Sequence, residues 1–321
     1  MRSIRPIFNS KNSKWGIRLL LIVLAAGSVA IWFSRRSSSD ADLKAQIDRV
    51  RQLTRSSDTT TFSDVVDRTV VRIPAGEFMM GSDTGRGDEK PERSVYLDAF
   101  DLDRFEVTNA QYQRFLQATG RTAPPYWTGV GYPIGQTDFP VVGVSWEEAD
   151  AYCSWIGKRL PTEAEWEKAC RGVDGRTYPW GNLWDYARGN VETSEQSAWP
   201  LDWDQAWTIL KSTSTTSHSR QLQPIGSYPE GASPYGVLDM VGNASEWVED
   251  WYNWSDYTAL PSHNPRSSGP PWNHVVRGTP WFDPYGSTSW IQVMSRCAAR
   301  NSSHETRDPR VGFRCAVSVV P

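Results

Sequence analysis

Residues Val144 to Gly172 read VSWEEADAYCSWIGKRLPTEAEWEKACRG, and this stretch contains two helix starts in close succession. Ser145 with Glu148, and Thr162 with Glu165, each match the capping box. In that motif a hydroxyl caps an unpaired N–H of the first turn, and the side chain three positions on reaches back to the N–H of the cap. The stretch therefore predicts two neighbouring helices.

The apolar positions of both helices recur at helical spacing: Ala149, Tyr152, Cys153 and Ile156 in the first, and Trp166, Ala169 and Cys170 in the second. Such a stripe marks the face that packs against the core. One cysteine therefore lies on the inward face of each helix.

The same pattern recurs outside this stretch. A third capping box, Thr108 with Gln111, predicts a helix that ends at Gly120, since glycine suits a left-handed C-cap. Short apolar runs such as Thr69–Ile73 and Ser94–Leu97 indicate strands, and long loops rich in Pro, Gly and Trp separate the elements. The expected fold class is α+β, with more irregular chain than usual.

The composition indicates a globular protein of 321 residues, with 39% hydrophobic residues. One domain over residues 65–321 is the economical interpretation. Residues 37–64 form a predicted stalk, in which Leu43, Ile47, Val50 and Leu53 have the spacing of a short amphipathic helix. The net charge of -3 offers no basic surface, so nucleic acid is not an expected partner.

Residues 1–36 contain an uncharged apolar run, Leu19–Phe33, which together with the residues from Trp15 approaches the ~20 residues that cross a bilayer. Five basic residues flank each side and leave the orientation open: Arg2, Arg5, Lys11, Lys14 and Arg18, against Arg35, Arg36, Lys44, Arg49 and Arg51. We expect a membrane anchor with the domain extracytoplasmic, in the periplasm or at the cell surface. Cleavage near Ser28-Val29-Ala30 would instead release a secreted protein.

The chain has four cysteines, Cys153, Cys170, Cys297 and Cys315. An even number beyond a membrane-directed segment favours two disulfides, because an exported domain meets an oxidising compartment. No two cysteines are as close as in zinc-binding motifs. From the residues alone, three pairings remain open.

Three further patterns bear on function. The segment Leu238–Trp247 places carboxylates and a Gly-containing turn together, which suits a hard cation, although a solvated turn is the simpler explanation. Trp247, Trp251, Trp254 and Tyr257 have helical spacing and predict a buried helix face. The aromatic side chains Trp281, Phe282 and Tyr285 fall in a Pro/Gly-framed loop, and loops lie at surfaces, so they could line a ligand groove.

The sequence resembles the formylglycine-generating enzyme, or sulfatase-modifying factor, family. The matching segments are IPAGEFMMGSD (73–83), DRFEVTNAQY (103–112), residues 144–172, YPWGN (178–182), LDMVGNASEW (238–247), RCAAR (296–300) and GFRCA (312–316). The resemblance runs from about residue 65 to the C-terminus. It implies a variant of the C-type-lectin-like fold.

The resemblance also implies the disulfides Cys153–Cys315 and Cys170–Cys297, and a structural calcium site. The implied calcium ligands are Asp239, Gly242, Ala244 and Glu246. A second calcium site would begin at Asn190 and Val191, but no clear acidic partner can be identified between Val191 and Pro224, which makes that site doubtful.

The sequence departs from the family at the residues that bind its copper. The family's enzymes bind Cu(I) through two further cysteines shortly before RCAAR, and use dioxygen to convert a substrate cysteine to formylglycine. Residues 279–296 contain no cysteine, and Met294 is the one sulfur there. Because Cu(I) prefers thiolate or thioether ligands, copper is not expected as a cofactor.

The leading hypothesis is therefore a non-oxidase binding or accessory module for a peptide, a glycan or an envelope protein. Its groove candidates are Trp281, Phe282, Tyr285, Trp290, Arg296 and Arg300. The alternative is an oxidative protein-maturation enzyme that works without the two copper cysteines, with polar candidates Arg277, Ser287, Ser289, Gln292, Arg296, Arg300 and Asn301. A third possibility is an assembly part that oligomerises through its stalk.

Overall fold

The computed structural model describes residues 21–24, 27–30, 70–129, 131–191, 207–208, 210–211, 222–254, 256–269, 273–283, 287–304 and 307–319. The chain divides into two units, Met1–Thr61 and Phe62–Pro321. In the first unit, β1 (Leu21–Leu24) pairs antiparallel with β2 (Gly27–Ala30), so the described parts of the apolar run are strands. The predicted stalk helix lies outside the described residues. No helix in the described part of the chain is long and apolar enough to cross a membrane.

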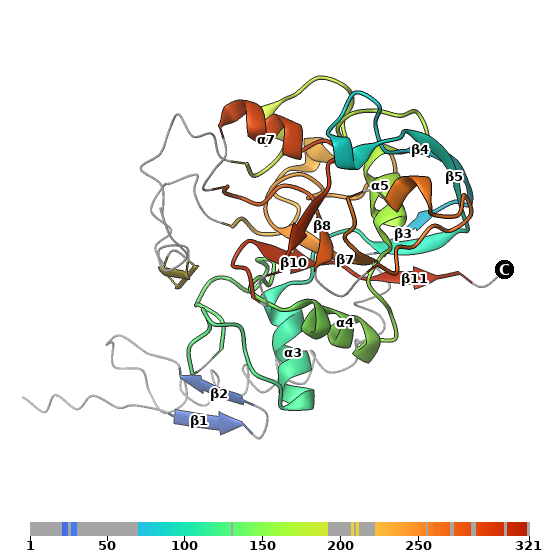
Figure 1. The fold of residues 1–321 in the computed structure, drawn as a ribbon. Coiled ribbons are helices and arrows are strands. Elements are labelled where there is room, and N and C mark those ends of the chain that lie inside the picture. The colour runs from blue at the N-terminus through green and yellow to red at the C-terminus, as the bar shows by residue number, and fades with distance from the viewer. Residues whose placement is uncertain are drawn as a thin grey trace, which may run out of the picture. The chain divides into compact units, whose positions relative to one another are not determined.

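Three helices of the second unit begin where the sequence predicts. They are α3 (Asn109–Thr119), α4 (Trp146–Trp155) and α5 (Glu163–Arg171), and each begins with a complete capping box. Gly120 ends α3 in the left-handed conformation, with φ 70°. A fourth helix, α7 (Thr288–Met294), is capped by the Ser287 hydroxyl. Figure 1 shows α3 and α4 together on one side of this unit, well separated from α7.

The strands of the second unit form three small sheets within the described residues. One has the order β10-β7-β8-β9, a second β11-β6-β3, and the third joins β4 and β5. Their bounds are β3 Val70–Ile73, β4 Gly76–Met80, β5 Arg93–Leu97, β6 Phe100–Asp103, β7 Ser245–Trp251, β8 His274–Arg277, β9 Asn301–Ser303, β10 Val311–Phe313 and β11 Ala316–Ser318. The predicted mixture of helices and strands is confirmed.

One element was mispredicted. The aromatic residues from Trp247 onward, expected to lie on a helix, begin in strand β7. This strand pairs in parallel with β10 and antiparallel with β8. Pairing with two partners that are distant in sequence therefore overrides the helical spacing of the tryptophans.

Two hydrophobic clusters form the core of the second unit, and each contains one disulfide. Cys153–Cys315 lies in the cluster around α3, α4 and β10. Cys170–Cys297 lies in the cluster around α5, β3 and β6. These are the two pairs that the family resemblance implies, and they leave no cysteine free. Each bridge ties a helix to the C-terminal part of the chain.

Candidate functional site

Helix α7 occupies the segment in which the family's copper cysteines would lie, so the site begins there. All four cysteines are bridged. The one other sulfur of the segment, in Met294, is buried and accepts a hydrogen bond from Arg86 Nη1 at 2.9 Å. A single engaged thioether is no ligand set for Cu(I). The residues present therefore do not fit a copper centre.

Three of the predicted groove residues lie in the interior, and for them the prediction was wrong. Trp281 and Phe282 are 1% and 2% exposed and belong to the hydrophobic core. Arg300 is fully buried, and its Nε and Nη2 donate to the Glu163 carboxylate at 2.8 and 2.9 Å. Because these side chains pack inward, they cannot line an open groove. Arg277, a candidate of the enzyme hypothesis, is likewise buried between Glu163 and Glu167.

Two predicted residues do reach the surface, Trp290 on α7 and Arg296 just after it. Trp290 is 39% exposed, donates its indole N–H to Asp283 at 2.9 Å, and lies under the Arg86 guanidinium, 5.4 Å from its ring centroid. Arg296 is partly buried and pairs with Glu89 at 2.6 Å. Tyr285 lies outside the described residues. An exposed tryptophan held in one position by two polar partners is a typical anchor for a ligand.

A cluster of aromatic residues that the sequence did not single out adjoins α7. Trp180 and Trp184 are 5.8 Å apart, and Trp184 is 5.1 Å from Tyr186. The Gln292 side chain of α7 donates to the Tyr186 hydroxyl at 3.2 Å, which connects the cluster to the helix. The motif YPWGN contains Trp180, but nothing in the sequence shows that this loop reaches α7.

We define the α7 surface as Trp180, Trp184, Tyr186, Trp290 and Gln292. A cavity of about 30 Å³ opens beside it, and its lining includes Pro280, Asp283, Met294, Asn301, Ser302 and Arg310. Such a volume holds about two water molecules. A ligand of the α7 surface would therefore lie across it rather than enter a deep pocket.

The predicted calcium segment is built around buried acids. Glu246 accepts hydrogen bonds from Arg314 and from the indole of Trp166, and Asp239 accepts one from the Gly226 N–H at 2.6 Å. Nearby Glu106 is buried, and burial together with the charges of Asp239 and Glu246 raises its pKa well above the ordinary value.

Three acids here share one arginine, and carboxylate and main-chain carbonyl oxygens are the ligands that suit calcium. Across the described ranges, no group of three or more His, Cys, Asp or Glu side chains could hold a metal ion, so main-chain carbonyls would have to contribute. Asn190, named for the doubtful second site, lies against the same segment. Its carbonyl accepts from the Asn243 N–H at 3.0 Å.

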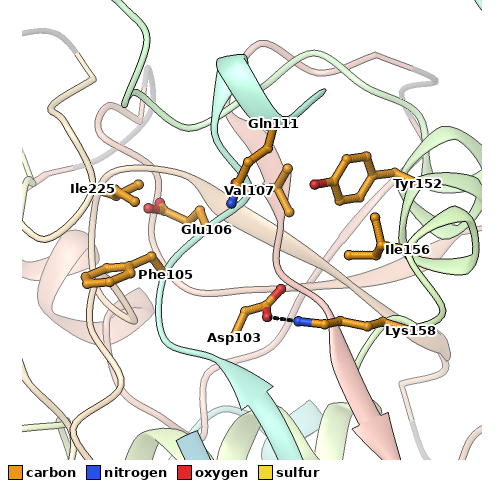
Figure 2. Close-up of a pocket in the computed structure, with 9 residues that line it drawn as sticks. All are labelled: Asp103, Phe105, Glu106, Val107, Gln111, Tyr152, Ile156, Lys158 and Ile225. Carbon is orange, nitrogen blue, oxygen red and sulfur yellow. Dashed lines mark hydrogen bonds and ion pairs between the residues drawn. The ribbon is translucent and has the colours of Figure 1, made fainter. Parts of the chain in front are cut away.

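A second small pocket, also of about 30 Å³, lies between β6 and α4. Figure 2 shows the ion pair of Asp103 and Lys158, 2.5 Å apart, on one side of this pocket and the hydroxyl of Tyr152 pointing into it. Burial raises the pKa of Asp103, an effect that Lys158 partly offsets. Asp103 also accepts the N–H of Cys315 at 3.1 Å, so this ion pair supports a disulfide.

Residues 57–319 match the family described as sulfatase-modifying factor enzyme 1-like domain. The chain is 32% identical to the formylglycine-generating enzyme of Bos taurus, over 78% of this chain and 75% of the relative. It is 30% identical to the bovine protein named inactive C-alpha-formylglycine-generating enzyme 2, over 77% of this chain and 87% of that relative.

It is also 34% identical to the serine/threonine-protein kinase pkn1 of Chlamydia caviae, over 78% of this chain but only 38% of that relative's length. Among solved structures, PvdO from Pseudomonas aeruginosa is similar, with a TM-score of 0.58 and 25% identity over 78% of this chain and 94% of PvdO. The chain therefore belongs to the sulfatase-modifying factor, or formylglycine-generating enzyme, family.

Proposed function

We propose that this family member is a non-oxidase binding or accessory module, whose α7 surface holds a peptide, a glycan or an envelope protein. The observation that carries the proposal is that every cysteine of the chain is in a disulfide. Without a thiolate pair, the family's copper-dependent oxidation has no ligand set here. A relative named as inactive is in keeping with this proposal.

The α7 surface supports a binding role. Trp290 and Tyr186 are 39% and 38% exposed, and Leu183 beside the aromatic cluster is 84% exposed. Exposed apolar groups rimmed by polar ones mark interaction sites. Indole and phenol rings combine contact area with a hydrogen-bonding group, which suits both glycans and peptides.

Three accompanying properties belong to the same proposal. The domain is extracytoplasmic and membrane-anchored through its N-terminal segment, or secreted after cleavage; two disulfides support an oxidising compartment. Calcium is a structural cofactor at the Asp239–Glu246 segment. The fold is a C-type-lectin-like variant.

The proposal is tested with two assays on the purified protein. The first incubates it with Cu(I), dioxygen and a cysteine-containing sulfatase peptide, and follows formylglycine by mass spectrometry; we expect none. The second measures binding to arrays of peptides and of envelope glycans. A Trp290→Ala variant should lose at least tenfold in affinity for the bound species, whereas Trp155→Ala, which alters an equally exposed tryptophan on α4, should not.

The outcomes separate the candidate functions. Formylglycine formation would overturn the proposal and favour oxidative maturation by another route. Equal binding by the two tryptophan variants would place the binding site away from α7.

A further inference from the structure

A second exposed tryptophan adjoins the α7 surface through residues 86–87. Trp254 follows strand β7 and is 58% exposed, although the sequence predicts a buried helix face there. A Cβ on Gly87 would lie 3.1 Å from Cζ2 of the Trp254 indole, so Gly87 packs against this ring. The preceding residue, Arg86, lies over the ring of Trp290, 5.4 Å from its centroid. Residues 86–87 therefore connect the two exposed tryptophans.

The contacts of the α7 surface thus continue as far as Trp254. On one side of α7, Gln292 donates to the Tyr186 hydroxyl at 3.2 Å, and on the other Trp290 lies against Arg86. We call this series of contacts the aromatic row; it consists of Trp180, Trp184, Tyr186, Gln292, Trp290, Arg86, Gly87 and Trp254. A ligand that spans the row meets several aromatic rings in succession, which suits a molecule built from repeating units.

The charged side chains along the row are engaged within the protein. Arg86 pairs with the buried Asp88 at 3.4 Å, and Asp185 pairs with Arg188 at 3.0 Å. Asp283 accepts the indole N–H of Trp290 at 2.9 Å. Since recognition of a charged ligand needs a complementary potential, the row favours an uncharged ligand over an acidic one.

The cavity of about 30 Å³ beside α7 adds a position for a small polar group, and its lining includes Asp283, Asn301 and Ser302. Asp283 also holds Trp290, so the cavity adjoins the row. Oδ1 of Asn301 accepts the Ser302 N–H at 2.9 Å, whereas no described residue accepts from the amide N–H groups of Asn301. A cavity that holds about two water molecules admits a hydroxyl or hydroxymethyl group but no large apolar side chain.

Sugars combine both properties that the row and the cavity require. The C–H groups on the face of a sugar ring pack on an aromatic ring, and its hydroxyls both donate and accept hydrogen bonds. A proline-rich peptide also docks on aromatic side chains, but it has no hydroxyl for the cavity.

We propose that the aromatic row binds a linear, uncharged glycan. Successive sugars stack on the exposed rings, and one hydroxyl or hydroxymethyl group enters the cavity beside Trp290. This inference rests on the proposed binding function of the α7 surface, names its class of ligand, and adds Trp254 to the residues that bind it.

The first test uses the hexamers and dimers of β-1,4-linked glucose and of β-1,4-linked N-acetylglucosamine, in isothermal titration calorimetry with the purified protein. At least one hexamer should bind about tenfold more tightly than its dimer, because only the longer chain reaches several rings. Trp254→Ala should weaken binding of that hexamer about tenfold, whereas Trp254→Phe keeps a ring and should retain most of the affinity. Trp155→Ala, which alters an exposed tryptophan on α4, is the matched control.

The second test observes the sugar itself. In saturation-transfer NMR with the wild-type protein, the ring C–H protons of the bound hexamer should receive more saturation than the protons of the reducing end, since they face the indoles. This measurement needs no variant. Because Trp254 is mostly exposed, its substitutions should also leave the core unchanged.

The outcomes separate this inference from the function on which it rests. The inference is wrong if neither hexamer binds at millimolar concentration, or if Trp254→Ala binds the hexamer as tightly as wild type. If a decaproline peptide binds instead and Trp290→Ala abolishes that binding, the ligand is a peptide and the proposed function stands. If no glycan and no peptide of the arrays binds, both are wrong.

Discussion

The guanidinium of Arg314 donates to both carboxylate oxygens of Glu246, from Nη2 to Oε1 and from Nε to Oε2, each at 2.7 Å. Both side chains are buried, and Arg314 also donates to the carbonyls of Asp103, Arg104 and Leu238. The pair thereby joins the C-terminal GFRCA motif to the start of β7 and to the end of β6. A buried pair of this geometry is costly to break from one side.

Replacing Arg314 with Ala should destabilise the domain by about 3–5 kcal/mol, because Glu246 would remain buried without its partner. Arg314→Lys keeps the charge but loses the two-point contact and should lie between wild type and Ala. Urea unfolding followed by tryptophan fluorescence measures both. A loss below about 1 kcal/mol for Arg314→Ala would show that other groups compensate the buried Glu246 carboxylate.

Calcium should raise the thermal stability of the wild-type protein, because an ion that binds only the folded state shifts the unfolding equilibrium. We expect a higher Tm in millimolar calcium than in EGTA, and no such difference for Asp239→Asn, which alters a predicted ligand. The control is Asp101→Asn, which alters an acid paired with exposed Arg72 and should keep the full calcium effect. Equal Tm values with and without calcium in the wild type would refute the site.

Removal of the bridge Cys170–Cys297 by a double alanine substitution should lower the free energy of unfolding by about 2–5 kcal/mol, since the bridge closes a long loop and lies in the core. Guanidinium unfolding provides the value.

Alkylation of the native protein before reduction should label none of the four cysteines. A labelled cysteine would reopen the question of a metal-binding thiolate.

His274 should make the free energy of unfolding of the domain fall at acidic pH. This side chain stacks on Trp146 at 3.9 Å, and burial lowers its pKa to about 4. Its contribution is present above the unfolded pKa of ~6.5 and is lost as the pH falls through the folded value of about 4. The loss amounts to about 3 kcal/mol.

His274→Phe retains a stacking ring without a titrating group, so it should lose less stability than wild type between pH 6.5 and 4. The contribution of nearby Asp250 to stability changes with pH in the opposite direction. Burial and the charge of Glu163 raise its pKa to about 7, so its contribution is present below its unfolded value and is lost as the pH rises through about 7. The difference between wild type and His274→Phe isolates the histidine. Parallel pH curves for the two proteins would contradict its role.

Gly85 should not tolerate a side chain, because a Cβ there would lie 2.0 Å from Oε2 of the buried Glu89. Gly85→Ala should cost about 1–3 kcal/mol, the usual range for overpacking. Gly129→Ala is the matched control, since nothing lies within 4 Å of its Cβ position. Thermal unfolding compares the two, and equal Tm values would show that the Glu89 side chain can move aside.

The helix starts could be predicted because their determinants are local. In α3, α4 and α5 the hydroxyl and the returning side chain are three residues apart, and no distant partner is needed to form the cap. The burial of Trp281 and Arg300 could not be predicted from such local patterns. Trp281 is held by the carbonyl of Asn243 at 2.7 Å and Arg300 by Glu163, contacts that only the folded chain brings together.

The family motifs implied both disulfides, whereas the α7 surface could not be predicted from the sequence. Tyr186 reaches Gln292, and Arg159 covers Ala316, across large separations along the chain. Such pairings depend on loop paths that neither periodicity nor composition determines. Local patterns and family motifs therefore predict the helix starts and the disulfides more readily than the surface sites that distant loops form.

The two bridges are nested, since Cys170–Cys297 lies within the loop that Cys153–Cys315 closes. A single proteolytic cut anywhere between Arg171 and Arg296 would therefore produce two fragments that both bridges still join. Such a molecule would migrate as one band on a non-reducing gel and as two after reduction. A protease could thus convert this chain into a covalently linked heterodimer without releasing either part.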